Sequence, residues 1–162
     1  MVTERLIQDK IFMFLQRKNE KKTNYDCIST NVKIYNWESD MLFTDRSDRV
    51  YEIEIKTSTG DYKADFKKTK KHNAIKHKVG AIPNYFYFVV PKKSKDKVNL
   101  PDEYGLIVYD QRLNFQTIKE ARQLHKGKVE FRDKMKLVKS NYYKYWNERL
   151  KHETKIFNIR KN

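Results

Sequence analysis

The sequence is poor in the residues that cross-link a chain or interrupt it. Its 162 residues include one cysteine, Cys27, together with four glycines and three prolines. A single cysteine excludes an intrachain disulfide and a zinc site built from cysteines, and it indicates a reducing compartment. No Gly/Ser-rich linker divides the chain, which is long enough for one domain with a hydrophobic core. We therefore expect a single domain over residues 1–162.

Long apolar segments are also missing. No run approaches the roughly 18 apolar residues that a membrane span requires, and the first residues lack the pattern of a secretion signal. We therefore expect a cytoplasmic protein with no membrane partner. A basic amphipathic helix on an anionic membrane surface is the weaker alternative. The abundance of lysine and asparagine indicates an AT-rich genome, either bacterial or that of a phage in its host's cytoplasm.

Acidic residues are few relative to basic ones. The chain has 36 Lys and Arg against 21 Asp and Glu, which gives a formal net charge of +15. Such an excess attracts polyanions, of which nucleic acid is the commonest. Most of these charges can contact only phosphates, which position a protein without reading base sequence. The sequence predicts nucleic acid as the partner and leaves open whether two copies form a homodimer.

Hydrophobic spacing predicts an α/β domain in which helices flank a central mixed β-sheet. Thr3 is placed to cap the first helix. We expect helices over 3–18 and 62–77, and strands over 31–37, 41–44, 52–56, 85–90 and 105–109. From residue 117 onward the pattern predicts helices with a break near Gly127. This divides the domain into a core of about 1–116 and a C-terminal helical extension of about 117–162.

The most informative segment is the predicted strand that ends in Glu54-Ile55-Lys56. Side chains alternate between the two faces of a strand, so Glu52, Glu54 and Lys56 share one face. A surface hairpin with cross-strand ion pairs would explain that pattern. However, the predicted strand–helix–strand order makes this strand central, where charges are costly unless they are paired or bind a metal. The segment is therefore a candidate catalytic site.

Asp40 precedes this strand, across a predicted hairpin, and completes a set suited to phosphodiester hydrolysis. Mg²⁺ or Mn²⁺ prefers oxygen ligands and needs only one or two carboxylates. Asp40 and Glu54 can supply these, and the backbone carbonyl of Ile55 can add a third oxygen. Lys56, on the same face as Glu54, can orient or deprotonate the attacking water or stabilise developing negative charge. We expect Asp40, Glu54 and Lys56 to be the catalytic residues.

These residues resemble the PD-(D/E)XK nuclease signature, with Ser39 in place of the proline that gave the signature its name. A longer span, from Asn36 to Asp110, resembles the MmcB-like DNA-repair family. The residues that carry this resemblance are Ser39-Asp40-Met41-Leu42, Glu54-Ile55-Lys56-Thr57-Ser58, Asp61-Tyr62-Lys63-Ala64-Asp65, Lys68, Tyr85-Phe86-Tyr87-Phe88-Val89-Val90-Pro91, Leu100-Pro101 and Gly105-Leu106-Ile107-Val108-Tyr109-Asp110.

The resemblance implies a restriction-endonuclease-like core and a metal-dependent nuclease of DNA repair, recombination or phage DNA processing. It also implies an acidic metal ligand from the first helix, for which Glu4 is the first candidate and Glu20 the second. One departure is that Lys68 is followed by Thr69, where the family pattern has a tryptophan. This affects the packing of the helix or its contact with DNA and leaves the metal ligands intact.

Other polar residues have less direct roles. Glu52 could bind a second metal ion, but an outer-shell or surface position is the better interpretation. Asp61 is better explained as a helix cap than as a ligand. Asp65 is expected to pair with a lysine.

The segment from Tyr62 to Val79 is strongly basic and starts next to the candidate site. Runs of charge usually form a solvated helix face, but this position favours phosphate contacts. We assign such contacts to Lys67, Lys68, Lys71 and His72. The aromatic cluster from Tyr142 to Trp146 could stack on unpaired bases, although packing on the domain is the better interpretation. Phe131 is also expected to pack on the domain.

These observations predict a metal-dependent DNA endonuclease, more selective for DNA structure than for sequence. A basic nucleic-acid-binding protein without activity is the main alternative, because a fold does not fix a function. The set of Asp40, Glu54 and Lys56 argues against it, since a binding protein does not need all three. A ribonuclease is a third possibility, since net charge does not distinguish DNA from RNA.

Overall fold

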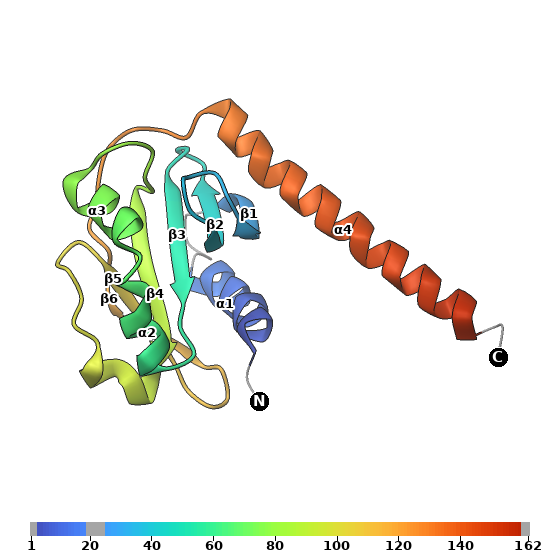
Figure 1. The fold of residues 1–162 in the computed structure, drawn as a ribbon, viewed down its shortest axis with the longest axis horizontal. Coiled ribbons are helices and arrows are strands. Elements are labelled where there is room, and N and C mark those ends of the chain that lie inside the picture. The colour runs from blue at the N-terminus through green and yellow to red at the C-terminus, as the bar shows by residue number, and fades with distance from the viewer. Residues whose placement is uncertain (1–2, 19–24, 160–162) are drawn as a thin grey trace.

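The computed structural model describes residues 3–18 and 25–159, which form a six-stranded sheet with helices on both faces (Figure 1). The strands lie in chain order across the sheet: β1 (Tyr25–Val32), β2 (Ser39–Asp45), β3 (Val50–Ile55), β4 (Tyr85–Pro91), β5 (Gly105–Tyr109) and β6 (Phe115–Lys119). β3, β4 and β5 are parallel, whereas the remaining neighbours pair antiparallel. The predicted α/β class with a mixed sheet flanked by helices is confirmed.

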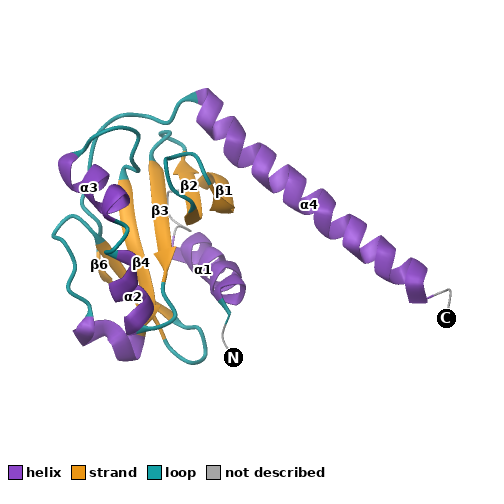
Figure 2. Ribbon diagram, viewed as in Figure 1, coloured by secondary structure: helices purple, strands orange, loops and turns teal. Residues whose placement is uncertain are grey.

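Helices lie on both faces of this sheet (Figure 2). They are α1 (Glu4–Lys18), α2 (Thr59–Asp65), α3 (Thr69–His77) and α4 (Phe131–Ile159), with a short 3-10 helix η1 (Lys92–Lys97) after β4. As predicted, Thr3 caps α1, because its Oγ1 accepts a hydrogen bond from the backbone N–H of Leu6. None of the helices among the described residues has the length and apolar character needed to cross a membrane.

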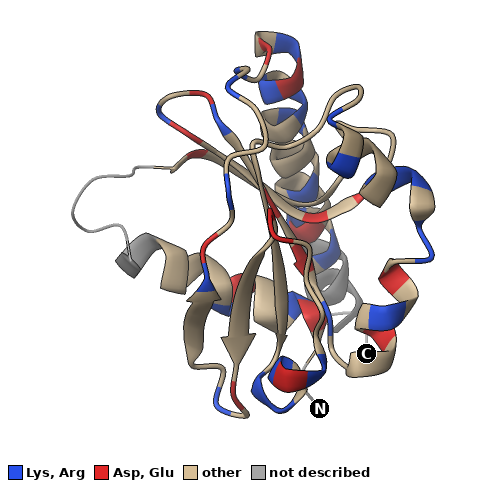
Figure 3. Cartoon of the chain, turned by 90° about the vertical axis from the view of Figure 1, so that its left-hand side faces the viewer, with Lys and Arg blue, Asp and Glu red and all other residues tan. Residues whose placement is uncertain are grey.

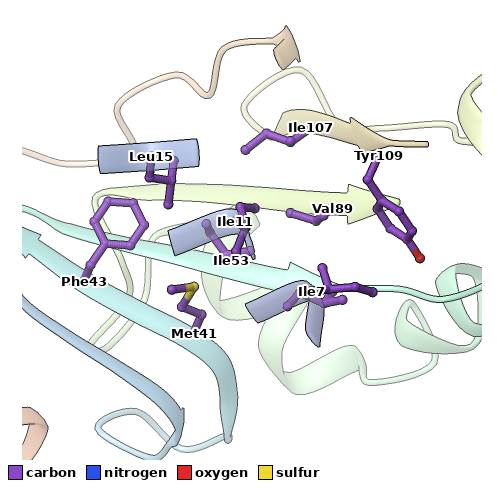
Figure 4. Close-up of a cluster of buried hydrophobic side chains, with 10 residues drawn as sticks. Ile7, Ile11, Leu15, Met41, Phe43, Ile53, Val89, Ile107 and Tyr109 are labelled. Carbon is purple, nitrogen blue, oxygen red and sulfur yellow. The ribbon is translucent and has the colours of Figure 1, made fainter. Parts of the chain in front are cut away.

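The first core lies between α1 and one face of the sheet (Figure 4). Ile7, Ile11 and Leu15 recur at helical spacing and pack on side chains that alternate along the strands. The strand residues of this core are Met41, Phe43, Ile53, Ile55, Val89, Ile107 and Tyr109. Because odd-numbered residues of β3 fill this core, Glu52 and Glu54 point to the opposite face.

The second core occupies that opposite face, under α2 and α3. Tyr62 of α2 and Ile75 of α3 pack there against Phe86 and Phe88 of β4. β4 therefore contributes buried side chains to both cores, which explains its nearly continuous apolar sequence. The charged residues of β3 consequently lie beneath helices, within the protein.

The segment predicted as one helix over 62–77 contains two helices. Ser58 caps α2, and its Oγ accepts a hydrogen bond from the backbone N–H of Asp61. α2 ends at Asp65, and Lys68 has a non-helical backbone before α3 begins. This interruption turns both Asp65 and the first turn of α3 toward β3, as the ion pairs described below require.

The sequence prediction is also wrong for residues 33–37 and 117–130. β1 ends at Val32, whereas 115–119 form β6, which pairs antiparallel with β5. Residues 120–130 form neither helix nor strand, so the sheet extends past the predicted core boundary at 116, and the extension consists of one helix, α4. β6 was missed because its side chains alternate between partly buried and exposed in a short, polar sequence.

α4 packs on the sheet through one side only. Leu137 is completely buried against β1 and its neighbours, and farther along Asn141 and Lys144 donate hydrogen bonds to the backbone carbonyls of Ile28 and Thr30. The rest of the helix extends beyond the sheet (Figure 1). The predicted packing of the aromatic cluster is wrong, because all five side chains are exposed: Phe131, Tyr142, Tyr143, Tyr145 and Trp146.

Candidate active site

Strand register brings Asp40 to Glu54. The predicted turn of the β2–β3 hairpin is formed by Asp45, Arg49 and the residues between them. In the two strands that this turn joins, Leu42 pairs with Glu52. Continuing this antiparallel register by two residues puts Asp40 opposite Glu54. Side chains two residues apart on a strand point to the same face, so Asp40 shares the face of Leu42 and Glu54 shares the face of Glu52. Leu42 and Glu52 are paired, so the two carboxylates lie on the same face of the sheet. The expected convergence of Asp40 and Glu54 is therefore a property of the hairpin.

A hydrogen bond fixes the Asp40 carboxylate. Its Oδ2 atom accepts the backbone N–H of Ile55 at 2.6 Å, which ties β2 to the residue between Glu54 and Lys56. Burial and the nearby charge of Glu54 raise the pKa of Asp40 to about 7, against the smaller opposing effect of this hydrogen bond. The site thus places the Asp40 carboxylate close enough to Glu54 that the charge of Glu54 disfavours ionisation of Asp40.

Glu54 and Asp65 form a buried network with two lysines. Lys56 Nζ lies 2.7 Å from Glu54 Oε1 and 3.0 Å from Asp65 Oδ1. Lys71 Nζ lies 2.9 Å from Glu54 Oε2 and 3.0 Å from Asp65 Oδ2. All four side chains are at most 5% exposed. Two positive and two negative charges therefore compensate one another in an environment where any unpaired charge would be costly.

Asp65 has further partners and anchors this network. Lys68 Nζ lies 3.0 Å from Asp65 Oδ1, and His72 Nε2 lies 2.8 Å from Asp65 Oδ2. Burial by itself would raise the pKa of Asp65, but His72, Lys71 and Lys56 lower it well below its usual range. Asp65 stays ionised and holds the lysines on the face of β3. The expected pairing of Asp65 with a lysine is confirmed.

Lys56 is held in its charged form. Burial acts to lower the pKa of the amine, but the carboxylates of Glu54 and Asp65 outweigh it and raise that pKa. A lysine that stays protonated can stabilise negative charge or orient water through its hydrogens, but it cannot accept a proton. Of the roles predicted for Lys56, this environment favours charge stabilisation over general-base catalysis.

The oxygen atoms of the site have the chemistry that Mg²⁺ or Mn²⁺ prefers. Glu54 Oε2 is buried and, despite its ion pair with Lys71, receives no hydrogen bond from any described residue. Together with Asp40 and the carbonyl of Ile55, it gives an all-oxygen donor set. Within residues 3–18 and 25–159, no group of three or more His, Cys, Asp and Glu side chains is arranged to hold a metal ion. The candidate set therefore rests on two carboxylates.

Glu4 lies at the edge of this set. Gln8 Nε2 donates hydrogen bonds to Glu4 Oε1 at 3.1 Å and to the backbone carbonyl of Asp40 at 3.0 Å. Burial and the charge of Glu54 raise the pKa of Glu4, so its carboxylate belongs electrostatically to the site. Glu4 is itself exposed. Glu20, the second candidate from the first helix, lies outside the described residues.

Glu52 is not a surface residue. It is 0% exposed, and its Oε1 accepts a hydrogen bond from Trp37 Nε1 at 2.9 Å. Burial raises the pKa of Glu52 to about 8, which the positive charge of Lys71 only partly opposes. The carboxyl group is thus mainly protonated at neutral pH, and a surface role is excluded.

The predicted phosphate contacts occupy very different environments. Lys67 and Lys68 are exposed, and Lys68 is 61% exposed despite its contact with Asp65. Lys71 is only 2% exposed and is held by two carboxylates, so the prediction of a phosphate contact for it is wrong. His72 is 11% exposed, with one ring nitrogen at Asp65 and the other 3.0 Å from the hydroxyl of Tyr104. It serves the network rather than the surface.

A basic pocket opens beside the network. It has a volume of about 460 Å³ and is lined by Asn36, Trp37, Glu38, Lys67, Lys68, Thr69, Lys70 and Lys71. Lys71 reaches from this pocket to Glu54, so the pocket adjoins the candidate site. Basic residues also occur widely over the helices and loops around the acidic positions of the central strands (Figure 3).

Sequence reasoning underestimated three residues of this site. Asp65 was assigned only an ion pair, Lys71 a surface role, and Gln8 no role. A signal for Asp65 and Lys71 was present in principle, since each lies on the helical segment that follows the strand of Glu54. Gln8 follows Glu4 by one turn of α1, but nothing in its local sequence indicates a contact with β2.

Comparison with known proteins identifies the fold alone. No protein-family model and no curated protein matches the chain. A solved structure of a protein of unknown function from Silicibacter pomeroyi is similar, with a TM-score of 0.60 and 14% sequence identity. The match covers 93% of this chain and 90% of that one. The α/β architecture therefore recurs in a protein of almost the same extent.

Proposed function

We propose that the protein is a divalent-metal-dependent nuclease that hydrolyses phosphodiester bonds in DNA. The observation that carries the proposal is the hydrogen bond from Ile55 to Asp40, which fixes a carboxylate beside Glu54 and Lys56. The buried acidic pair with an adjacent lysine has the ligand chemistry and the positive charge that this reaction requires. The net charge of +15 supports a polyanionic substrate.

Asp40, Glu54 and the carbonyl of Ile55 would hold Mg²⁺ or Mn²⁺, with Glu4 at the edge of the set. The bound ion would polarise the phosphate, activate water and screen the leaving group. Lys56 keeps its proton and stabilises the negative charge that develops on the phosphoryl oxygens. Asp65 is a positioning residue, because it holds the Lys56 ammonium at 3.0 Å.

The substrate approaches across a basic surface. Lys67, Lys68 and Lys70 line the pocket beside the ion network and are exposed to solvent. Contacts from these side chains to phosphates would position DNA without selecting a base sequence. This favours structure-selective cleavage in DNA repair, recombination or phage DNA processing.

A nucleic-acid-binding protein without activity is the second candidate. It is favoured by one observation, the engagement of Glu54 by both Lys56 and Lys71, because such a network could serve the fold alone. In that case Asp40 and Glu54 would have no catalytic duty. The same assay tests whether the substrate is RNA instead of DNA.

The test is cleavage of single-stranded, duplex, flapped and four-way-junction DNA, and of one RNA, with Mg²⁺, Mn²⁺ or EDTA. We expect cleavage with either metal and none in EDTA. Asp40→Asn and Glu54→Gln should abolish it with little loss of DNA affinity. Exposed Asp102→Asn and Glu103→Gln are the matched controls and should cleave normally. Cleavage that persists in EDTA or in the Glu54→Gln variant would overturn the proposal.

A further inference from the structure

α4 exposes large aromatic side chains that have no place in a core. Tyr142 is 58% exposed, Tyr143 64%, Tyr145 55% and Trp146 44%. Leu150, one turn farther along, is 59% exposed. We call the surface formed by these five residues the α4 aromatic face. Contiguous exposed apolar surface of this kind usually marks an interaction site.

The aromatic face lies away from the sheet. Residues that recur at helical spacing contact the domain: Lys134, Leu137, Asn141, Lys144 and Glu148. The aromatic residues occupy the remaining sides of the same turns, so the domain does not cover them. The solvent side of the helix therefore carries large aromatic side chains among its charged residues, unlike an ordinary surface helix.

The rings form a continuous cluster. The ring centroids of Tyr142 and Tyr143 are 5.7 Å apart, those of Tyr142 and Trp146 are 6.2 Å apart, and those of Tyr145 and Trp146 are 5.5 Å apart. The Arg149 guanidinium lies 5.8 Å from the ring centroids of both Tyr145 and Trp146. Aromatic rings interleaved with a guanidinium are the groups on which nucleic-acid bases stack.

Charge selects the class of partner. From Phe131 to His152 the helix carries seven Lys and Arg against two Asp and Glu. Two packed helices lie 8–10 Å apart, about one Debye length at physiological salt, so pairing α4 with a second copy would bring like charges within unscreened range. A polyanion gains from the same charges. Unpaired strands fit best, because bases in a duplex do not offer a free ring face to the protein.

We propose that the α4 aromatic face binds unpaired nucleic-acid strands, with bases stacked on Tyr142, Tyr145 and Trp146 and phosphates contacted by neighbouring lysines and arginines. The choice of nucleic acid as partner rests on the proposed function. The domain side of α4 meets the first helix, since Glu148 Oε1 lies 3.7 Å from Arg5 Nη1, and Arg5 follows Glu4 in the sequence. A strand bound on α4 would therefore lie beside the helix that carries Glu4.

The test measures binding of a labelled oligothymidine of about 20 nucleotides to the full chain in EDTA, in the Glu54→Gln background, so that no cleavage interferes. The double variant Tyr142→Ala/Trp146→Ala should bind it at least about 30-fold more weakly, the scale of losing two stacked bases. Phe131→Ala is the matched control, since it removes an exposed ring of the same helix outside the aromatic face. It should bind within about twofold of the parent, and duplex affinity should change much less than single-strand affinity in the double variant.

Fluorescence reports the contact directly. The chain has two tryptophans, so the difference in quenching between the parent and Trp146→Phe reports Trp146. We expect oligothymidine to quench Trp146. Equal oligothymidine affinity in the parent and the double variant would overturn the proposal. Quenching of Trp146 by phosphatidylserine vesicles but not by oligothymidine would also overturn it. The same holds if sedimentation shows that the parent is a dimer and the double variant is a monomer. Binding and quenching can be measured even if the protein does not cleave DNA. A failure of the proposed function is therefore distinguishable from a failure of the proposed binding face.

Discussion

Lys71 Nζ lies 2.9 Å from Glu54 Oε2, and both side chains are 2% exposed. The ammonium also lies 5.3 Å from the ring centroid of Phe86, so it is surrounded by groups that stabilise a cation. Lys71 thereby supplies, from a helix, a positive charge that compensates a carboxylate of the central sheet. The fold thus tolerates the charged face of β3 because the charges are paired within the protein.

Removal of Lys71 should destabilise the protein strongly. Lys71→Ala leaves Glu54 and Asp65 short of one buried counter-charge, and breaking a buried ion pair in this way costs about 3–5 kcal/mol. Lys70→Ala removes an exposed neighbour and should change the free energy of unfolding by less than about 0.5 kcal/mol. Urea denaturation of both variants checks this. A loss below about 1 kcal/mol for Lys71→Ala would show that the network contributes little to the fold.

Lys56 should matter for turnover more than for metal binding. Lys56→Ala removes the charge that faces the substrate, and loss of such electrostatic stabilisation lowers kcat by about 100-fold or more. Affinity for Mn²⁺ should change little, because Lys56 donates no ligand. Lys97→Ala, at an exposed position, is the control. Near-normal kcat in Lys56→Ala would make Lys56 a structural partner of Glu54 and Asp65 only.

Metal affinity should depend on pH through Asp40. Burial and the charge of Glu54 raise the pKa of Asp40 to about 7, so below that pH the carboxyl group is protonated and cannot bind a cation. Affinity for Mn²⁺ should rise about tenfold per pH unit up to about pH 7 and level off above it. Calorimetric titration between pH 5.5 and 8.5 measures this profile. Asp40→Asn should bind Mn²⁺ weakly with no such dependence, and the same steep profile in that variant would assign the titration to another group.

The hairpin and the convergence of Asp40, Glu54 and Lys56 could be predicted because both depend on local patterns. Alternation along β3 fixes the face of Glu54 and Lys56, and a short turn fixes the register that brings Asp40 opposite Glu54. The burial of Lys71 could not be predicted, because a lysine within a basic run is typical of a solvated helix face. Its position depends on the interruption between α2 and α3, which turns Lys71 toward β3.

The environment of the α4 side chains was also hard to predict, because it too depends on tertiary structure. Helical spacing of aromatic residues predicts a buried face, and the spacing along α4 is helical. Burial nevertheless requires a surface to pack against, and here the domain contacts the side of α4 that carries Leu137, Asn141 and Lys144. Helical spacing correctly predicted a helix over Phe131–Ile159, whereas the side that meets the sheet is set by tertiary structure.

The salt dependence of DNA binding should locate the path of the phosphates. Lys68 is 61% exposed and lines the basic pocket with Lys67 and Lys70. If each contacts one phosphate, Lys68→Ala/Lys70→Ala should flatten the slope of log affinity against log salt by about 1.8 on duplex DNA, since each contact contributes about 0.9. Fluorescence anisotropy at several salt concentrations measures the slope. An unchanged slope would place the phosphates elsewhere, for example along η1 or α4.

The protonation of Glu52 can be tested by measuring stability against pH, without an assay of catalysis. Its pKa is raised from 4.5 to about 8 by burial, so between these values the folded protein holds a proton that the unfolded chain releases. Stability from this group is therefore lost as pH rises through that window, by about 1.4 kcal/mol per pH unit. Glu52→Gln keeps an oxygen for the N–H of Trp37 and removes the titration.

Relative to the parent, Glu52→Gln should gain roughly 2 kcal/mol of stability between pH 6 and pH 7.5, measured as the difference in free energy of unfolding at each pH. The titration of Asp40 occurs in both proteins and cancels in that difference. Exposed Glu103→Gln should show no such gain. Because Glu52 is completely buried and lies outside the proposed set of metal ligands, the variant should also keep its cleavage activity. A constant stability difference across this pH range would mean that Glu52 is ionised in the folded protein, with its charge balanced by Lys71.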